Sequence, residues 1–287
     1  MATIEIRGVL HAYDLSAPSP DSSTPVLVFI HGWLLSRLYW QPIIEQLSPR
    51  YQCLAYDLRG FGDSILRNPA PDSGYTLAHY AQDLGLLLEK LNISRTWLVG
   101  HSLGGSIALW GAEYVADRVQ GVVCLNSGGG IYLQEEFERF RAAGEQLIKR
   151  RPRWLPYVPL IDLIFAQAMV ARPLPRRWGY QRVLDFVRAD ERAALGALLD
   201  STTEAEVHLL PQVVARLKQP VYFVAGAKDK VMEPKYVRYL ASFHASFPKG
   251  SSNVIELADC GHLSMVEQPD RVAANLLGIL SNSALIS

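Results

Sequence analysis

A short turn in the sequence reads Leu98-Val99-Gly100-His101-Ser102-Leu103-Gly104-Gly105. An apolar, strand-like run at residues 95–99 precedes it, and a helix-like run at residues 106–114 follows it. In this setting the pattern Gly-x-Ser-x-Gly is typical of a sharp, strained turn that lifts the serine hydroxyl above the edge of a sheet. Such a turn has no room for large flanking side chains, which accounts for Gly100 and Gly104. The pattern therefore predicts a nucleophile at Ser102, in preference to a buried serine in a glycine-rich turn.

Composition limits the classes of protein that the chain can belong to. With 287 residues, of which 49% are hydrophobic, it can bury a large core, as one α/β domain with an insertion or as two domains. Lys plus Arg equals Asp plus Glu, at 28 each, so the formal net charge is zero and nucleic acid is not expected as a partner.

Several features concern the compartment in which the protein works. Three cysteines form an odd, sparse set, which indicates a reducing compartment without a disulfide framework. The first six residues alternate like a strand, so we expect no signal peptide. A run of about 18 apolar residues, as a spanning helix needs, does not occur. We therefore expect a cytoplasmic protein.

Apolar, β-branched runs recur along the chain with helical stretches between them. Strands are predicted near residues 3–6, 10–14, 26–30, 51–56, 96–99, 121–125, 221–225 and 253–257. The predicted helices include residues 39–47, 77–91, 106–114, 236–243 and 271–280. Apolar strands that alternate with helices indicate a parallel sheet covered on both faces, and the first two strands are close enough for an antiparallel hairpin at one edge. The predicted fold class is α/β, with an eight-stranded, mostly parallel sheet.

The alternation stops between residues 128 and 216. This stretch has helical periodicity, several prolines and most of the arginines, but no convincing strand. We expect residues 1–127 and 217–287 to form the α/β core, and residues 128–216 to form a helical cap inserted after the sixth strand.

Three side chains that follow predicted strands are candidates for a proton relay. They are Ser102, Asp229 and His262. Because the carboxyl ends of parallel strands meet at one edge of the sheet, these residues are expected to converge there. A serine hydroxyl is a weak nucleophile at neutral pH and needs an adjacent base, which a third group orients. The sequence therefore predicts Ser102 as nucleophile, His262 as base and Asp229 as the orienting acid.

Together these motifs resemble those of α/β-hydrolases over nearly the whole chain. The matching pieces are His31-Gly32-Trp33, residues 57–64, residues 100–105, residues 226–229 and Gly261-His262. The chain order Ser, Asp, His also agrees with that superfamily. The resemblance implies an oxyanion site made by the backbone N–H groups of Trp33 and Leu103. No metal or other cofactor is expected, because the usual metal and phosphate motifs are missing from the sequence.

Rival acids exist for this relay. In some α/β-hydrolases the orienting acid follows the sixth strand, but here Asn126 stands at that place. Asp259 precedes His262 by only three residues and suits a hydrogen-bonded loop better. Asp57 lies in a glycine-rich loop, where it and Arg59 are expected to hold the backbone through charged hydrogen bonds.

The cap contains an apolar segment between two groups of basic residues. Residues 139–192 carry 12 Lys and Arg against 5 Asp and Glu. The plain interpretation is an amphipathic lid with solvated arginines. A sharper hypothesis is that the apolar side lines a substrate channel and that the basic rim contacts an anionic membrane. The substrate-binding candidates are Trp154, Tyr157, Phe165 and Met169, and the basic residues before them include Arg150, Arg151 and Arg153.

The function predicted from these features is hydrolysis of a hydrophobic carboxylic ester through an acyl-enzyme. In the character of residues 154–170 the chain is similar to chlorophyll dephytylases and pheophytinases, which implies a long isoprenoid ester such as the phytyl ester of chlorophyll. The chlorophyllase elbow differs, with arginine where Leu103 stands.

Two other functions remain open at this point. One is a cofactor-independent C–C bond hydrolase or lyase of the meta-cleavage or menaquinone-pathway type, whose anionic substrate Arg37, Arg172 or Arg177 could bind. The other is a ligand sensor built on a hydrolase shell, which a single stoichiometric burst in place of multiple turnover would reveal.

Overall fold

The computed structural model of the chain describes residues 1–19, 21, 23–64, 74–129, 134–245 and 253–284. Its strands are β1 (Ala2–Ile6), β2 (Val9–Leu15), β3 (Val26–Ile30), β4 (Cys53–Tyr56), β5 (Thr96–His101), β6 (Val119–Leu125), β7 (Val221–Gly226) and β8 (Val254–Leu257). Its α-helices are α1 (Gln41–Leu47), α2 (Leu77–Lys90), α3 (Leu103–Tyr114), α4 (Gln134–Lys149), α5 (Ile161–Gln167), α6 (Arg176–Arg188), α7 (Glu191–Ser201), α8 (Glu204–Arg216), α9 (Pro234–Ala241), α10 (Ser264–Glu267) and α11 (Pro269–Ala284). Short 3₁₀ turns are η1 (Arg37–Trp40) and η2 (Leu155–Tyr157).

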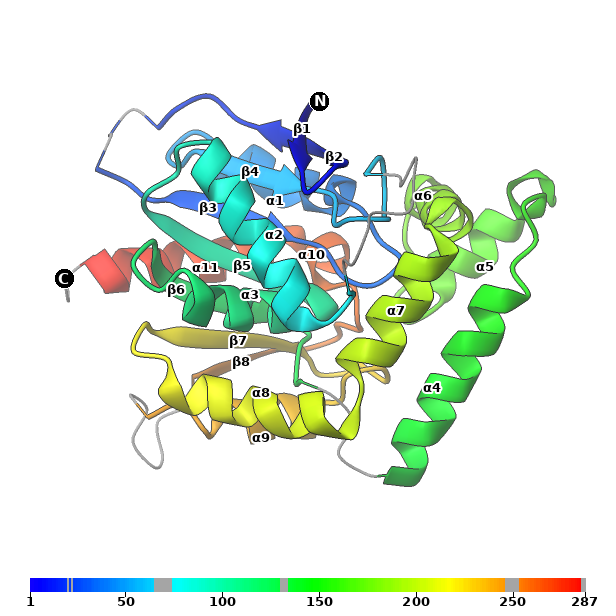
Figure 1. The fold of residues 1–287 in the computed structure, drawn as a ribbon. Helices are drawn as coiled ribbons and strands as arrows, with labels where there is room; N and C mark the ends of the chain where they lie inside the picture. The colour runs from blue at the N-terminus through cyan, green and yellow to red at the C-terminus, as the bar shows by residue number, and fades with distance from the viewer. Residues whose placement is uncertain (20, 22, 65–73, 130–133, 246–252, 285–287) are drawn as a thin grey trace.

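The strands form one sheet in the order β1-β2-β4-β3-β5-β6-β7-β8 (Figure 1). β1 pairs antiparallel with β2, and β2 pairs antiparallel with β4, whereas the remaining neighbours run parallel. The predicted α/β class and the eight-stranded, mostly parallel sheet are therefore confirmed, including the antiparallel hairpin at one edge.

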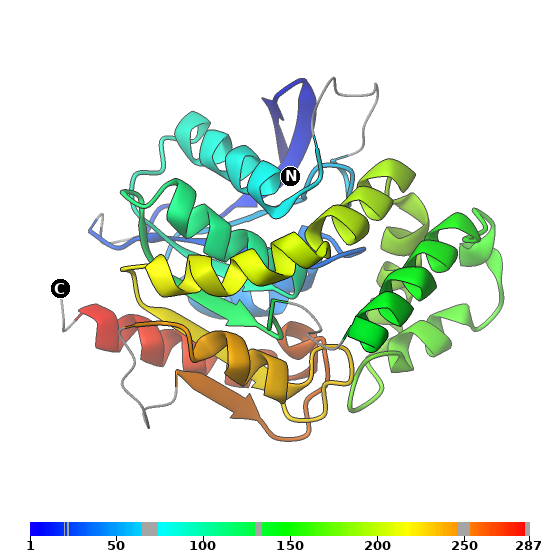
Figure 2. The same ribbon diagram turned by 60° about the horizontal axis from the view of Figure 1, so that its bottom comes forward.

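Helices cover both faces of this sheet, as continuous apolar strands require. Along β5, Leu98 packs into one core with residues of α2, α3, α8 and α9. Its neighbours Trp97 and Val99 pack into the other core, with residues of α1 and α11. Figures 1 and 2 show these two helical layers on opposite sides of the strands. Because successive side chains of a strand point to opposite faces of the sheet, one apolar strand contributes to both cores.

The helices α4 to α8 are inserted between β6 and β7. Helices α4 to α7 gather at one end of the sheet, to the right in Figure 1, and we call residues 134–203 the cap. Helix α8 departs from the expected division, because Leu210, Val213 and Val214 pack in the core with α3. The helical periodicity of residues 128–216 predicted helices in this stretch but not the surface that each one covers. Helix α8 thus lies against the core, and the name cap is used here for α4 to α7 alone.

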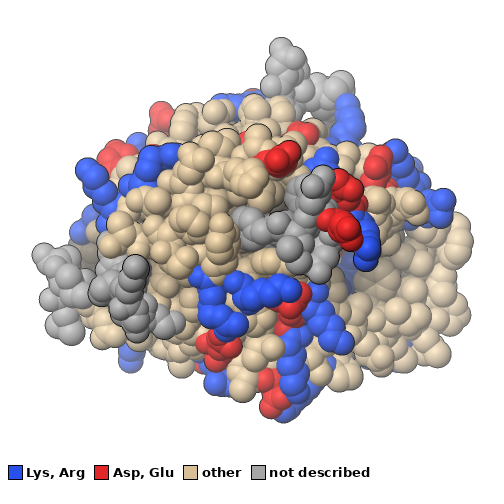
Figure 3. All heavy atoms as spheres, turned by 90° about the horizontal axis from the view of Figure 1, so that it is seen from below, with Lys and Arg blue, Asp and Glu red and all other residues tan. Residues whose placement is uncertain are grey.

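The outer surface carries both signs of charge. Seen from below, charged side chains gather over the middle of the molecule (Figure 3). The lower right of this view, on the side where the cap lies, is largely without them, whereas basic and acidic atoms appear at its upper right edge. Within the described ranges, no helix combines the length and the apolar character that crossing a bilayer requires.

Candidate active site

The predicted elbow is a strained turn between β5 and α3. Ser102 joins the two elements with φ 52° and ψ −119°. A positive φ is costly for a residue with a side chain, so the surrounding packing must hold it. A Cβ atom on Gly100 would lie 2.1 Å from the carbonyl oxygen of Gly104, and one on Gly104 would lie 2.2 Å from that of Ile30. Both positions therefore require glycine.

The three relay candidates come together at one edge of the sheet. His262 Nε2 lies 3.2 Å from Ser102 Oγ, and His262 Nδ1 lies 2.8 Å from Asp229 Oδ2. A carboxylate only accepts hydrogen bonds, so we assign the imidazole proton to Nδ1, which leaves Nε2 to accept the proton of the Ser102 hydroxyl. This arrangement can take a proton from Ser102 while its oxygen attacks an electrophile.

Asp229 is buried, and both of its carboxylate oxygens accept hydrogen bonds. Oδ1 accepts from the backbone N–H groups of Val231 at 2.8 Å and Met232 at 2.9 Å. Burial by itself raises the pKa of Asp229, but the nearby His262 and the hydrogen bonds outweigh that effect and hold the pKa below its usual value. The carboxylate therefore stays ionised beside the imidazole.

Asn126 has a supporting position that sequence reasoning missed. It follows β6 with φ 49°, and its amide nitrogen donates to Asp229 Oδ2 and to the carbonyl oxygen of Gly261, at 2.9 Å each. The side chain thus joins the loop of Asp229 to the loop of His262. An amide can donate to the acid where a second carboxylate would repel it, and the place of Asn126 directly after a strand was the available signal.

The rival acid Asp259 is engaged elsewhere. Its carboxylate pairs with Lys228 at 2.5 Å and with Arg172 at 3.4 Å. Hydrogen bonding to Lys228 and the positive charges lower the pKa of Asp259. It is the hydrogen-bonded loop carboxylate expected from its spacing.

Two buried histidines brace the loops around the nucleophile. His31 Nε2 accepts from the N–H of Leu58 at 2.9 Å, so its Nδ1 donates to the carbonyl oxygen of Gly32 at 2.8 Å. His101 Nε2 lies 2.7 Å from the carbonyl oxygen of His262, to which it donates. Burial lowers the pKa of both rings, to about 3 for His101. Both are neutral supports.

The two predicted oxyanion donors lie on the wall of the cavity that contains Ser102. Leu103 is the first residue of α3, so its N–H has no partner within the helix. Trp33 lies after β3, and its indole N–H donates to the carbonyl oxygen of Ala194 in α7 at 2.8 Å. The loop of Trp33 is therefore tied to the cap, while the oxyanion role stays a prediction.

The cavity beside Ser102 has a volume of about 430 Å³ and lies between the core and the cap. Small-molecule sites commonly measure ~300–1,000 Å³. The lining is mostly apolar and includes Trp33, Leu35, Leu77, Phe140, Phe165, Phe186, Leu198 and Met232. Within the described part of the chain, no group of three His, Cys, Asp or Glu side chains is placed to hold a metal ion.

Only part of the predicted substrate lining faces this cavity. Phe165 and Met169 line it. Trp154 and Tyr157 are not among its lining residues, and their side chains are 63% and 86% exposed. Their expected position is therefore wrong. An apolar composition predicts that the segment avoids water somewhere, but it does not say which side chains turn inward.

Arg182, in α6, is a cavity-lining residue that the sequence did not single out. The side chain is buried and lies over the ring of Phe165, 6.0 Å from the guanidinium carbon to the ring centre. Its guanidinium donates to the carbonyl oxygens of Phe165 and, at 2.6 Å, of Ala168. Burial lowers the pKa of Arg182. The described lining contains no other arginine or lysine.

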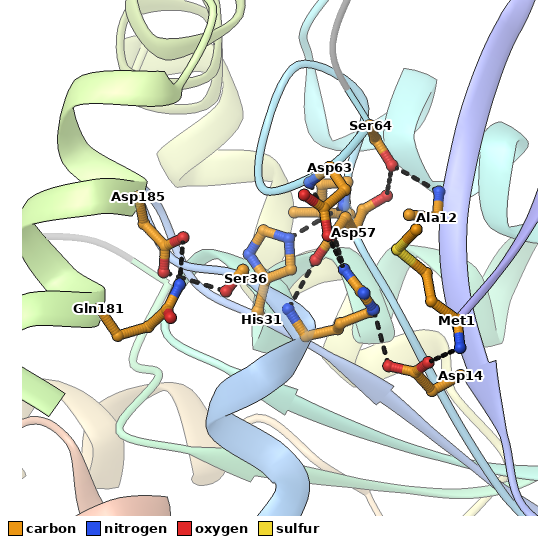
Figure 4. A network of polar contacts seen from close by, with 12 residues as sticks. Met1, Ala12, Asp14, His31, Ser36, Asp57, Asp63, Ser64, Gln181 and Asp185 are labelled. Atoms are coloured by element: carbon orange, nitrogen blue, oxygen red, sulfur yellow. Dashed lines mark hydrogen bonds and ion pairs between the residues drawn. The ribbon is translucent and has the colours of Figure 1, made fainter. Parts of the chain in front are cut away.

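The arginines suggested for an anionic substrate lie elsewhere. Arg37 is buried among carboxylates, where it pairs with Asp57, with Asp14 at 2.7 Å and with Asp63 at 2.8 Å. Figure 4 labels these three carboxylates. Arg172 and Arg177 are exposed and do not line the cavity. The Asp57 loop is thus held by charged hydrogen bonds, as predicted, but Arg37 belongs to that network and not to a substrate site.

An eight-stranded sheet of this order, with a serine at a strained turn after β5 and a cap after β6, is the architecture of an α/β-hydrolase. The chain belongs to the Alpha/beta hydrolase family, whose profile matches residues 27–275. It is 29% identical over 278 residues to the 2-succinyl-6-hydroxy-2,4-cyclohexadiene-1-carboxylate synthase of Yersinia pseudotuberculosis serotype O:1b (strain IP 31758), an alignment that covers 94% of each chain.

Two solved enzyme structures illustrate the shared fold. The thermophilic esterase of Thermogutta terrifontis superposes with a TM-score of 0.74 at 21% identity, covering 98% of this chain and 97% of the esterase. The enol-lactonase of Burkholderia xenovorans LB400 superposes with a TM-score of 0.74 at 22% identity, covering 98% of this chain and 100% of the lactonase. At these identities the likeness shows the fold.

Proposed function

We propose that this protein is a serine hydrolase of hydrophobic carboxylic esters. The observation that carries the proposal is the position of the Ser102–His262–Asp229 arrangement at the wall of a mostly apolar cavity. An apolar cavity favours an ester whose acyl or alcohol part is a hydrocarbon, because its burial releases water from both surfaces.

The proposed reaction follows from the hydrogen bonds of the relay. Ser102 Oγ attacks the ester carbonyl carbon while His262 Nε2 takes the hydroxyl proton, and Asp229 stabilises the imidazolium. The backbone N–H groups of Leu103 and Trp33 receive the oxyanion. His262 then gives its proton to the leaving alcohol. Water repeats the same steps on the acyl-enzyme and releases the acid.

A long isoprenoid ester, such as the phytyl ester of chlorophyll, is the substrate that we propose to test first. Three cavity residues, Leu147, Ile164 and Met169, are also 46–65% exposed, so the cavity reaches the surface through apolar side chains. A long chain could extend along them while its ester group remains beside Ser102.

A second candidate is C–C bond chemistry, which the relative from Yersinia pseudotuberculosis supports because its name specifies a synthase. That name also specifies a succinyl and a carboxylate group. Here the described cavity lining holds one guanidinium, that of Arg182, which already donates to two carbonyl oxygens. This lining favours an ester with little charge over a substrate with several carboxylates.

Turnover of a substrate panel tests the proposal. The panel runs from acetyl to long-chain and phytyl esters, with a vinylogous diketone as the C–C substrate, and the Ser102→Ala variant supplies the background rate. We expect multiple turnover on the hydrophobic esters. Faster cleavage of the diketone would replace the ester proposal by the second candidate, and a single burst followed by no turnover would indicate a ligand sensor.

A further inference from the structure

Five large apolar side chains are exposed within eleven residues of the cap. In η2, α5 and the residues that flank them, Trp154, Tyr157, Leu160, Leu163 and Ile164 are 63%, 86%, 59%, 36% and 65% exposed. We call these five residues the cap patch. Scattered apolar residues on a surface are ordinary, but a contiguous apolar patch marks a site of interaction with another surface.

The cap patch is continuous with the opening of the cavity. Ile164 belongs to the patch and also lines the cavity. Met169 and Leu147, which are 46% and 51% exposed, line the cavity as well. Whatever covers the patch therefore also adjoins the route by which a hydrophobic molecule reaches Ser102.

Basic residues flank the cap patch in the sequence. Residues 149–177 contain seven Lys and Arg but a single acidic residue, Asp162. Asp162 is itself paired with Arg176 at 2.5 Å. Arg150 and Arg153 are exposed, and neither forms an ion pair with a described residue. The patch therefore presents apolar groups within a positive field.

Arg151 differs from its two neighbours. Its guanidinium donates to the carbonyl oxygens of Phe186 at 2.8 Å and Ala189 at 2.5 Å, so it holds the cap together. Of these three arginines, Arg150 and Arg153 are thus available to an outside partner, whereas Arg151 is not.

We propose that the cap patch docks on the surface of an anionic lipid bilayer, with the cavity opening toward the lipid. Trp154 and Tyr157 enter the headgroup region, where amphipathic aromatic rings are stable, and the basic side chains contact anionic headgroups. A hydrophobic ester then passes from the bilayer to Ser102 without crossing water. This part rests on the proposed esterase function, whereas the docking itself does not.

A second copy of the chain is a poorer occupant of this surface. Two-fold pairing through the patch would place the basic residues of one copy next to those of the other, and like charges across an interface are unfavourable. An anionic bilayer offers the opposite charge over the whole patch.

Vesicle co-sedimentation of the full chain tests the docking. The probes are vesicles of phosphatidylcholine alone and of phosphatidylcholine with about one third phosphatidylglycerol, each at low and high salt. We expect wild type to bind the anionic vesicles, and to bind them less at high salt.

Two variants separate the apolar contribution from the charged one. Trp154→Ser with Tyr157→Ser should lower the partition coefficient at least about tenfold on anionic vesicles, because exposed aromatic area is lost. Arg150→Gln with Arg153→Gln should lower it on the order of 30-fold at low salt and flatten the salt dependence. None of these side chains lines the cavity, so hydrolysis of a short, water-soluble ester should be unchanged in both variants.

Matched controls lie on the core. Tyr114→Ser removes an aromatic ring that is 57% exposed in α3, and Arg50→Gln with Lys218→Gln removes two exposed charges. Both controls should bind vesicles as wild type does. Equal binding by wild type and the Trp154/Tyr157 variant, or no binding by wild type, would overturn the docking proposal.

Two further outcomes keep the proposals apart. Sedimentation velocity without lipid should show a monomer, and a dimer that the Trp154/Tyr157 variant abolishes would assign the patch to a second copy. Vesicle binding without ester turnover would remove the proposed function but keep the docking. Ester turnover without vesicle binding would remove the docking proposal but keep the proposed function.

Discussion

Ser102 is held in a backbone conformation that a serine adopts only when its surroundings impose it. Its φ of 52° directs the side chain out of the turn, and His262 Nε2 lies 3.2 Å from its oxygen. Asp229 in turn holds the imidazole through Nδ1 at 2.8 Å. At this scale the proposed chemistry depends on one hydroxyl, and its removal is the most direct test.

The first prediction concerns that hydroxyl. Ser102→Ala should lower kcat on any turned-over ester ~10³-fold or more, because no other group can form the acyl-enzyme. The melting temperature should stay within a few degrees of wild type, since the hydroxyl contributes little to the core. The control is Ser242→Ala, which removes an exposed hydroxyl that donates to the carbonyl oxygen of Tyr239. Near-normal turnover by the Ser102 variant would remove Ser102 from its proposed role.

The second prediction concerns Asp185 in α6, a buried carboxylate at the contact between cap and core (Figure 4). It accepts from Ser36 Oγ at 3.0 Å and from Gln181 Nε2 at 2.9 Å. Burial, aided by the negative charge of Asp57, raises the pKa of Asp185 to about 7 against the hydrogen bonds, which lower it. Below a pH of about 4 both the folded and the unfolded chain hold this proton.

Between pH values of about 4 and 7 the unfolded chain releases the proton of Asp185 and the folded chain keeps it, so the free energy of unfolding falls as pH rises. The contribution is present at low pH and is lost as pH rises through about 7. Asp185→Asn should remove this pH dependence of the free energy of unfolding, which corresponds to about one proton bound more by the folded chain. Urea unfolding of both proteins at several pH values measures it, and parallel pH curves would contradict the prediction.

At the scale of elements, the crossing of β5 and α3 sets the position of Ser102. Gly100 is the last residue but one of β5, and a Cβ there would lie 2.1 Å from the carbonyl oxygen of Gly104 and 2.6 Å from the Cα of Gly105. These are backbone atoms of α3 and cannot rotate away, so the helix itself would have to move.

The third prediction follows from this crossing. Gly100→Ala should lower the free energy of unfolding by ~1–3 kcal/mol or more through overpacking, and should lower kcat with it, because the displaced turn separates Ser102 from His262. Gly278→Ala in α11 is the matched control, since its Cβ would meet no atom within 4 Å. That control should be stabilised by ~0.4–1 kcal/mol. Thermal melts measure the stability of the two variants, and ester turnover measures their activity. An active, stable Gly100 variant would contradict the steric account.

At the scale of the whole molecule, Arg37 connects the N-terminal hairpin to the loops after β3 and β4. Its side chain is 4% exposed and pairs with Asp14 of β2, and with Asp57 and Asp63 beyond β4 (Figure 4). Burial alone would lower the pKa of Arg37, but these carboxylates outweigh burial and raise it. Asp57 is fully buried, so Arg37 supplies the positive charge that balances it.

The fourth prediction is that Arg37→Met destabilises the protein by ~3–5 kcal/mol, because it leaves the buried carboxylate of Asp57 without a counter-charge. Adding Asp57→Asn to the same chain should recover part of that loss. Urea unfolding of the two variants and wild type provides the measurement. A loss below about 1 kcal/mol for Arg37→Met would show that Asp57 is stabilised sufficiently by its backbone hydrogen bonds alone.

Local patterns were enough to predict the sheet, its edge hairpin and the strained turn. Each depends on neighbouring residues: alternation along a strand, or the absence of a side chain at Gly100 and Gly104. The convergence of Ser102, Asp229 and His262 was also predictable, because parallel strands bring their carboxyl ends to one edge.

Other features depend on packing between distant segments, which periodicity does not encode. The layer of α8, the outward position of Trp154 and Tyr157, and the buried position of Arg37 all follow from which surfaces meet after folding. The same holds for the hydrogen bonds from Asn126 to Asp229 and Gly261. The apolar or basic composition of a segment limits the kinds of surface that it can contact. The tertiary structure determines which surface it does contact, because burial and charge pairing act through space and not along the sequence.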